Sequence, residues 1–217
     1  MITLMIDTSN RPLSVAINED GRMVAEINTT VRKTHSATIM VHINHLLESS
    51  GYRRNDIDRI VVARGPGSYT GVRIGVTIAK TLAQALGVEL YSVSSLAVIA
   101  ASSGAKGNVL PMFDGRRGNV YSGLYHVSEH FEEVEAAGYK SLKTVYEEME
   151  KHEEVCLLAD GSEAFTENLP KYIHAVPRIT TVEQYPEILR RENIHEMVPE
   201  YLKISEAEKN WINQQQS

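Results

Sequence analysis

The sequence predicts an α/β protein of two similar halves, each with a mixed sheet and helices on both faces. Short apolar strands alternate with helix-length runs. The strands at 2–6 and 108–113 each end at an aspartate, followed by a polar turn and a returning strand. The two aspartates, Asp7 and Asp114, are 107 positions apart in a chain of 217 residues. A repeat of that length indicates a duplicated domain.

In the first half, alternating apolar residues and turn signals predict three antiparallel strands, and longer periodic runs predict helices. The first helix has an apolar stripe at Ile39, Ile43, Leu46 and Leu47, which we expect to face inward. The predicted strands are 2–6, 13–18, 23–29, 60–63 and 88–93, and the predicted helices are 36–49, 72–86 and 95–102.

The stretch from Arg64 to Gly87 organises this half. Gly65 and Gly67 allow a sharp turn, and Ser68 or Thr70 can cap the next helix. Small residues then recur every four positions along one side of this helix, and the opposite side is also apolar. Both sides of the helix must therefore pack against other parts of the protein or against a partner. The small residues are Gly71, Gly75, Ala79 and Ala83, and the opposite side is Ile74, Ile78, Leu82 and Ala85. We expect the small-residue ridge to admit a partner closely, so that Gly75→Arg or Ala79→Glu abolishes a complex without unfolding the monomer.

The second half begins after the glycine- and serine-containing stretch 103–107, a candidate domain boundary. We therefore expect domains at 1–103 and 104–204 and a polar tail at 205–217. The predicted strands are 108–114, 120–125, 132–137 and 155–159, and the predicted helices are 142–151, 162–172 and about 185–192.

Composition narrows the class of protein. The single cysteine, Cys156, excludes an internal disulfide framework. Without a secretory signal or a run of ~18 apolar residues, we expect a cytoplasmic protein with no membrane association. Residues 1–103 carry a net charge of +2 and residues 104–217 a net charge of −8, so the second half is a poor nucleic-acid surface.

The residue patterns indicate neither a catalytic group nor a metal centre. His42 and His45 lie three apart on a predicted helix and His35 lies further back, but a third ligand and a second shell are missing. The sequence around Ser68 lacks the Gly-x-Ser-x-Gly pattern of an activated serine. Cys156 lies in an apolar strand, which is typical of a core thiol.

Two halves that each open with strand, aspartate, turn and strand resemble the actin-like ATPases and sugar kinases. That resemblance implies a nucleotide site at the two turns, with Asp7, Thr8, Ser9, Gly67 and Asp114 as candidates, and the glycine turn offers amides to an anion. Ordinary hairpin and capping contacts remain the alternative. The chain has no Gly-Gly pair to make room for an adenosine.

Specific runs resemble the TsaB family of bacterial proteins. They are Ile6-Asp7-Thr8-Ser9, the run from Arg64 to Gly75, Ala79-Lys80-x-Leu82-Ala83, Asp114-Gly115-Arg116-Arg117 before Val120-Tyr121, and Pro199-x-Tyr201-Leu202-Lys203. The likeness is specific over residues 1–125. It implies an actin-like (ASKHA) two-domain fold and a non-catalytic scaffold in making N6-threonylcarbamoyladenosine next to the anticodon of tRNA.

The resemblance also implies partners. TsaD, the catalytic paralogue, would bind through the helices at 36–49 and 72–86, and TsaE would join the complex. The chain would form a homodimer when alone and meet tRNA only through the complex. A nucleotide (ATP or ADP) at the subunit interface stays open. The implied partner-binding residues are His35, Ile39, Met40, His42, Ile43, Leu46, Val72, Gly75, Val76, Ala79 and Ala83.

The paralogue carries two metal-binding histidines in Asn-His-Leu-Glu-x-His after the strand that follows the docking helix. Ser95 and Ile99 stand at those positions here, and isoleucine cannot bind a metal. The alternative is a free-standing actin-like ATPase, kinase or metallopeptidase, which the lost ligands disfavour.

Overall fold

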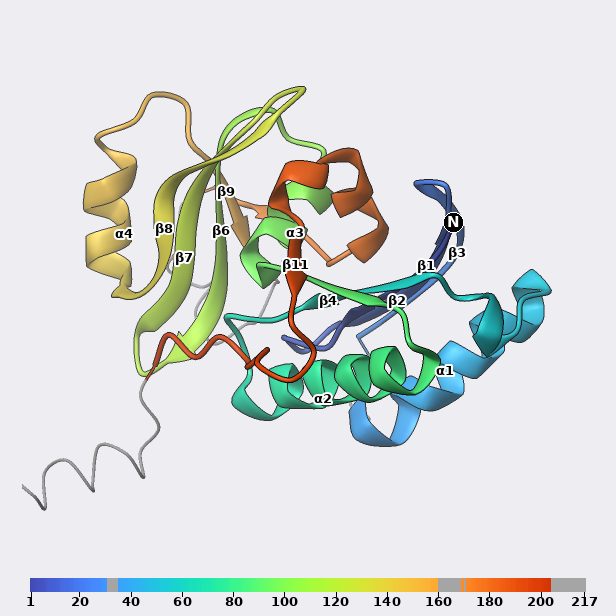
Figure 1. The fold of residues 1–217 in the computed structure, drawn as a ribbon. Helices are drawn as coiled ribbons and strands as arrows, with labels where there is room; N and C mark the ends of the chain where they lie inside the picture. Colours follow the sequence, from blue (N-terminus) through green and yellow to red (C-terminus); the bar gives the residue numbers. More distant parts are fainter. Residues whose placement is uncertain (31–34, 160–168, 170, 204–217) are drawn as a thin grey trace, which may run out of the picture.

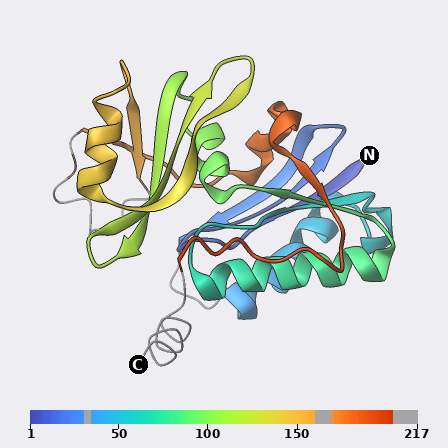
Figure 2. The same ribbon diagram turned by 60° about the vertical axis from the view of Figure 1, so that its left-hand side comes forward.

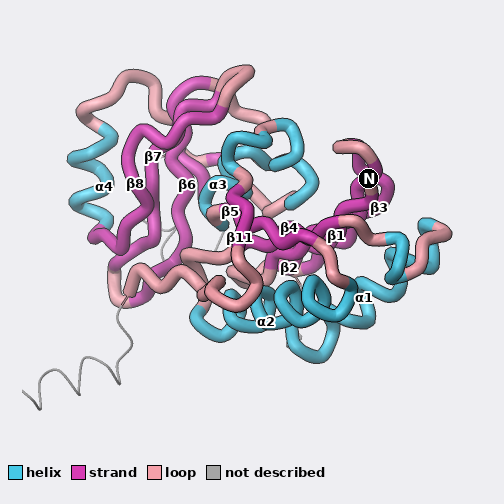
Figure 3. The backbone as a smooth tube through the Cα atoms, in the orientation of Figure 1, coloured by secondary structure: helices cyan, strands magenta, loops and turns pink. Residues whose placement is uncertain are grey.

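The computed structural model describes residues 1–30, 35–159, 169 and 171–203. Figure 3 shows how its strands and helices alternate along the chain. The strands are β1 (Ile2–Asp7), β2 (Leu13–Glu19), β3 (Arg22–Thr29), β4 (Arg59–Ala63), β5 (Glu89–Val93), β6 (Gly107–Arg116), β7 (Asn119–Val127), β8 (Phe131–Ser141), β9 (Cys156–Ala159), β10 (Ile173–His174) and β11 (Arg190–Glu192). The helices are α1 (His35–Ser50), α2 (Tyr69–Leu86), α3 (Ser95–Ser102) and α4 (Leu142–Met149), with 3-10 turns η1 (Arg54–Asp56), η2 (Ile179–Gln184) and η3 (Pro186–Ile188).

The first sheet is mixed, in the order β11-β5-β4-β1-β2-β3. Strands β1, β4 and β5 run parallel, while β2, β3 and β11 are antiparallel to their neighbours. Helices α1 and α2 lie side by side beneath one face of this sheet (Figure 1). Their inward side chains form one buried cluster with the strands, so the predicted inward stripe of α1 is confirmed.

The second sheet repeats this plan, in the order β10-β9-β6-β7-β8. Strands β6, β7 and β8 form an antiparallel meander. Strand β9 pairs in parallel with β6, and β10 pairs in parallel with β9. The order therefore matches β5-β4-β1-β2-β3 of the first sheet, strand for strand. The predicted class, an α/β fold duplicated into two mixed sheets with helices on both faces, is confirmed.

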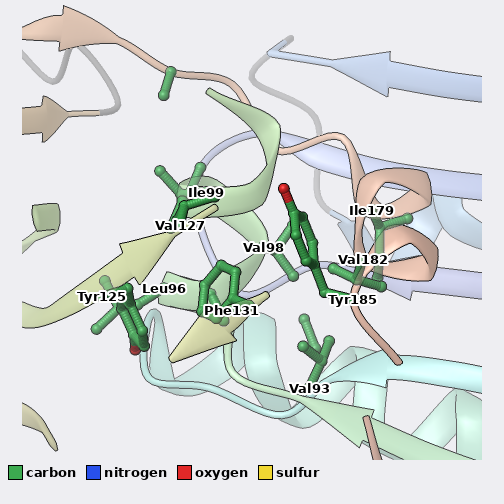
Figure 4. Packing of buried hydrophobic residues seen from close by; sticks show 14 of the residues in the cluster. Val93, Leu96, Val98, Ile99, Tyr125, Val127, Phe131, Ile179, Val182 and Tyr185 are labelled. Atoms are coloured by element: carbon green, nitrogen blue, oxygen red, sulfur yellow. The ribbon is translucent and has the colours of Figure 1, made fainter. Parts of the chain in front are cut away.

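Helix α3 joins the two halves because it lies between their sheets (Figures 1 and 2). It is almost wholly apolar, which suits a helix covered on all sides. Its side chains pack in one cluster with Met5 and Val61 of the first sheet and with Phe113 and Tyr125 of the second. Figure 4 shows Tyr125, Phe131 and Tyr185 converging on this helix. Helix α4 covers the outer face of the second sheet through Val145.

The predicted helix at about 185–192 is wrong. Tyr185, Ile188 and Leu189 have helical spacing, but this part of the chain forms η3 and then strand β11. The open edge of β5 offers unpaired backbone groups, and Arg190 to Glu192 pair with it. Paired backbone groups outweigh a short periodic pattern.

Other predictions in the second half remain open. The helix expected at 162–172 lies largely outside the described residues, since residues 160–168 and 170 are not among them. The tail at 205–217 lies outside the described residues as well. The domain boundary at 103–107 stays a prediction. Strand β11 nevertheless returns to the first sheet after the chain has built the second.

Candidate functional site at the glycine turn and the paired helices

The glycine turn between β4 and α2 packs directly on the turn that follows β1. The amide of Ser68 donates to the carbonyl of Ser9 at 2.6 Å. A Cβ on Gly67 would stand 2.1 Å from that same carbonyl oxygen, so only glycine fits there. The hydroxyl of Ser68 accepts a hydrogen bond from the amide of Gly71 at 3.3 Å and caps α2, as predicted.

Among the residues proposed for a nucleotide, Asp7 and Thr8 make hydrogen bonds within the chain, while the Ser9 hydroxyl is buried without a partner. Thr8 is fully buried, and its hydroxyl donates to the carbonyl of Gly71 at 2.7 Å. Asp7 is 1% exposed and accepts from the amide of Ser9 at 2.8 Å. Burial raises the pKa of the Asp7 carboxyl above its ordinary value. Thr8 and Ser9 are fully buried in the isolated chain, and the nucleotide site stays a prediction.

Asp114, the fifth nucleotide candidate, lies in the second sheet. Its carboxylate accepts from the amide of Arg116 at 2.7 Å, which organises the β6–β7 turn. The structure thus brings Asp7, Thr8, Ser9 and Gly67 together at the first sheet, whereas Asp114 belongs to the corresponding turn of the second.

The small-residue ridge of α2 faces its own sheet, which corrects the expected docking surface. A Cβ on Gly75 would meet the hydroxyl of Thr8 at 2.4 Å, and a Cβ on Gly71 would meet the carbonyl of Thr8 at 2.2 Å. Ala79 and Ala83 are fully buried in the same cluster. Gly75→Arg or Ala79→Glu would therefore unfold the monomer, so these variants cannot test docking as expected.

The same burial applies to most of the implied partner-binding residues. In the isolated chain eight of them are buried by their own half, and their role in binding a partner stays a prediction. They are Ile39, Ile43 and Leu46 of α1 and Val72, Gly75, Val76, Ala79 and Ala83 of α2. His35, Met40 and His42 are partly exposed, and the ring of His35 is bonded to the carbonyl of Asn10 at 2.8 Å.

The opposite side of α2 remains accessible. Ile74, Ile78 and Leu82 follow one another at four-residue spacing and are only half-buried by their own chain. Val41 of α1 is 63% exposed. The sequence held a signal for this orientation, since Val72 and Val76 flank the small residues while Arg73 and Thr77 flank the isoleucines. Apolar flanking residues widen the apolar stripe and so mark the face that enters a core.

The positions of the paralogue's metal ligands have structural roles here. The hydroxyl of Ser95 accepts from the amide of Gly65 at 3.1 Å, and the amide of Ser95 donates to the carbonyl of Gly65 at 2.8 Å. Ile99 is buried in the cluster between the sheets. Within the described residues, no group of three metal-ligating side chains comes together. No helix among those residues is long and apolar enough to cross a membrane.

The last described segment, residues 193–203, runs along α2 on the side away from α1 (Figure 1). Lys80 Nζ donates to the carbonyl of Met197 at 2.7 Å. The amide of Glu200 donates to the carbonyl of Arg64 at 2.7 Å, and the Glu200 carboxylate lies 3.5 Å from the Arg64 guanidinium. The segment therefore covers the glycine turn from outside.

Comparison with solved structures identifies the fold. A Pseudomonas aeruginosa protein described as similar to the peptidase YeaZ superposes with a TM-score of 0.81 and 22% identity, covering 93% of this chain and 99% of that one. YeaZ from the same organism gives a TM-score of 0.76 and 21% identity, with the same coverage. The chain thus has the α/β fold of these two proteins, which is built here from two mixed sheets of matching strand order.

Sequence comparison identifies the family. Residues 24–171 match the model of TsaD, the tRNA N6-adenosine threonylcarbamoyltransferase. The tRNA threonylcarbamoyladenosine biosynthesis protein TsaB of Bacillus subtilis is 36% identical over 99% of this chain and 100% of its own length. TsaB of Escherichia coli is 37% identical over 63% of this chain and 62% of its own. The chain belongs to the TsaB family.

Proposed function

We propose that this protein is a non-catalytic scaffold in threonylcarbamoyladenosine biosynthesis on tRNA, and that it binds the catalytic subunit TsaD through α1 and α2. The supporting observation is the half-buried apolar row Ile74, Ile78 and Leu82, named the outer face of α2. It lies beside α1, whose Val41 is 63% exposed. Apolar side chains that stay partly exposed at regular spacing are typical of a helix that packs against a neighbour.

The residues that replace the paralogue's ligands support the non-catalytic part of the proposal. Ser95 is fully buried, and its hydroxyl is used by the glycine turn. Ile99 offers no donor atom. At the positions that would carry metal chemistry, Ser95 supports the glycine turn and Ile99 packs between the two sheets.

Interface size is consistent with two helices. A stable complex needs about 800 Å² buried on each partner. Two adjacent helices of sixteen and eighteen residues offer a face of that order. In the absence of TsaD the same face can pair with a second copy about a two-fold axis, because the two patches are identical.

The test places a charge on the outer face. Ile78→Arg should leave the fold intact, since Ile78 is partly exposed, and should weaken TsaD binding at least ~100-fold, as expected for a central contact of an interface. Gln84→Arg adds the same charge to an exposed position of α2 and should bind as the parent does. Calorimetric titration with TsaD gives both affinities, and thermal unfolding checks both folds.

Two results would contradict the proposal. If the Ile78→Arg variant bound TsaD as tightly as the Gln84→Arg variant, the outer face of α2 would not be the docking surface. Sustained ATP hydrolysis by the purified chain alone, lost on substitution within this chain, would instead favour a free-standing enzyme.

A further inference from the structure

An aromatic and cationic cluster connects the two halves at the N-terminal end of α2. The guanidinium carbon of Arg73 lies 5.6 Å from the ring centre of Tyr69. The ring of Tyr69 stacks on that of Tyr201, with centres 4.4 Å apart and planes inclined by 21°. Tyr69 and Tyr201 are nevertheless 49% and 40% exposed. Two large exposed rings on the surface of a small protein need an explanation.

The cluster continues onto the second sheet through Lys203, two residues after Tyr201. Lys203 Nζ lies 4.8 Å from the ring centre of Tyr139 and donates to the carbonyl of Gly115 at 3.3 Å. The hydroxyl of Tyr139 donates to the carbonyl of Arg116 at 3.4 Å. Figures 1 and 2 show the end of the described chain passing from α2 to the β6–β7 turn, where these contacts are made.

The whole surface is named the bridge patch and consists of Tyr69, Arg73, Arg116, Tyr139, Tyr201 and Lys203. Its three cations, with the exposed Arg117 beside them, gather in a protein whose net charge is −6. Among the described residues, Asp114 and Glu200 place carboxylates close to it in sequence, and both carboxylates have local partners. Asp114 accepts from the Arg116 amide, and Glu200 lies beside Arg64.

We propose that the bridge patch binds unpaired nucleotides of the tRNA on which the complex acts. Cationic side chains attract phosphates, and exposed aromatic rings and guanidinium planes stack on bases. The patch offers both along a series of contacts that runs from α2 in the first half to Tyr139 in the second. An acidic peptide would match the cations and leave the exposed tyrosine faces without a counterpart. The inference rests on the proposed function, because tRNA reaches this chain as part of the TsaD complex.

The test measures binding of a labelled tRNA anticodon stem-loop at increasing salt, for the chain alone and with TsaD. Arg73→Gln/Arg116→Gln should weaken binding about 10-fold and lower the salt slope by roughly 1.4 to 1.8, the value for two lost phosphate contacts. Tyr201→Ala should weaken binding about 10-fold with the salt slope unchanged, because stacking releases no counterions.

The matched control is Arg53→Gln/Arg54→Gln, which removes the same charge from exposed positions after α1 and should retain the parent slope. An equal loss of tRNA affinity in the patch and control variants would overturn the inference. It would also be overturned if the parent protein, both alone and with TsaD, bound the stem-loop independently of salt or did not bind it at all. TsaD binding is measured separately on the same preparations. Failure of docking through α2 is therefore distinguishable from failure of the bridge patch.

Discussion

At the scale of single residues, Thr8 determines how closely α2 approaches the sheet. Its carbonyl lies against Gly71 and its hydroxyl against Gly75, one helical turn further on. The two contacts differ in kind. The hydroxyl can rotate away from an added methyl group if it gives up its hydrogen bond to the Gly71 carbonyl, whereas the backbone carbonyl directly after β1 cannot rotate.

This difference predicts the cost of each substitution. Gly71→Ala should destabilise the fold by about 2–3 kcal/mol through overpacking, less any gain in helix propensity. Gly75→Ala should cost less, and in a Thr8→Ala background its cost should largely vanish while that of Gly71→Ala persists. Urea unfolding of the single and double variants measures these differences. If Thr8→Ala reduced the cost of both glycine substitutions equally, the assignment of the two contacts would be contradicted.

Asp7 predicts a dependence of stability on pH. Burial raises its pKa in the folded state above the ordinary value of 3.8, so the folded protein holds the proton more tightly than the unfolded chain. The stabilising contribution is therefore fully present below about pH 4 and is lost as pH rises through the folded pKa.

Asp7→Asn keeps an oxygen for the Ser9 amide and removes the titration. The variant should gain stability relative to the parent as pH rises from about 4 toward neutrality, and the difference should be smallest at the acidic end. Denaturant unfolding at several pH values measures it. A difference that is constant with pH would show that Asp7 does not titrate in this way.

At the scale of elements, the sequence predicted where α2 lies but not which of its apolar faces turns inward. Both faces carry helical periodicity, and periodicity alone cannot distinguish a sheet from a partner. Gly75 signalled a close approach, and the approaching group is Thr8 of the same chain. The flanking valines Val72 and Val76 carried the missing information.

Elements in the first 127 residues were predicted well because turns and periodic runs alternate there without ambiguity. The segment 179–192 was not, since its short 3-10 turns and edge strand depend on tertiary partners. For instance, the guanidinium of Arg59 donates hydrogen bonds to both carboxylate oxygens of Glu183 in η2, each at 2.6 Å. Such a pair, separated by more than a hundred positions, leaves no local pattern.

The Arg59–Glu183 pair predicts how firmly η2 is held. Their side chains are only 14% and 7% exposed, so Glu183→Gln should cost ~3 kcal/mol by leaving a nearly buried guanidinium without its counter-ion. Replacing both residues by methionine should cost less than the single change. Glu147→Gln breaks the exposed Lys143–Glu147 pair and should change stability by less than ~0.5 kcal/mol. Urea unfolding compares the variants, and equal effects at both pairs would contradict the prediction.

At the scale of the whole molecule, α3 makes the two sheets share one core, because its side chains enter a cluster supplied by both. Ile99→Ala should therefore destabilise both sheets together, by about 2–5 kcal/mol. Hydrogen exchange should accelerate by a similar factor in β1 and in β7. Val41→Ala, at a 63% exposed position, should leave both rates nearly unchanged. Acceleration confined to one sheet would mean that the halves unfold independently.

The position of β11 has a consequence for synthesis on the ribosome. The growing polypeptide makes five strands of the first sheet, then the whole second sheet, and only afterwards the three residues that close the bare side of β5. Until then β5 exposes an unpaired strand edge, which is prone to wrong pairing. The first sheet is therefore completed only after the strands of the second sheet have been synthesised.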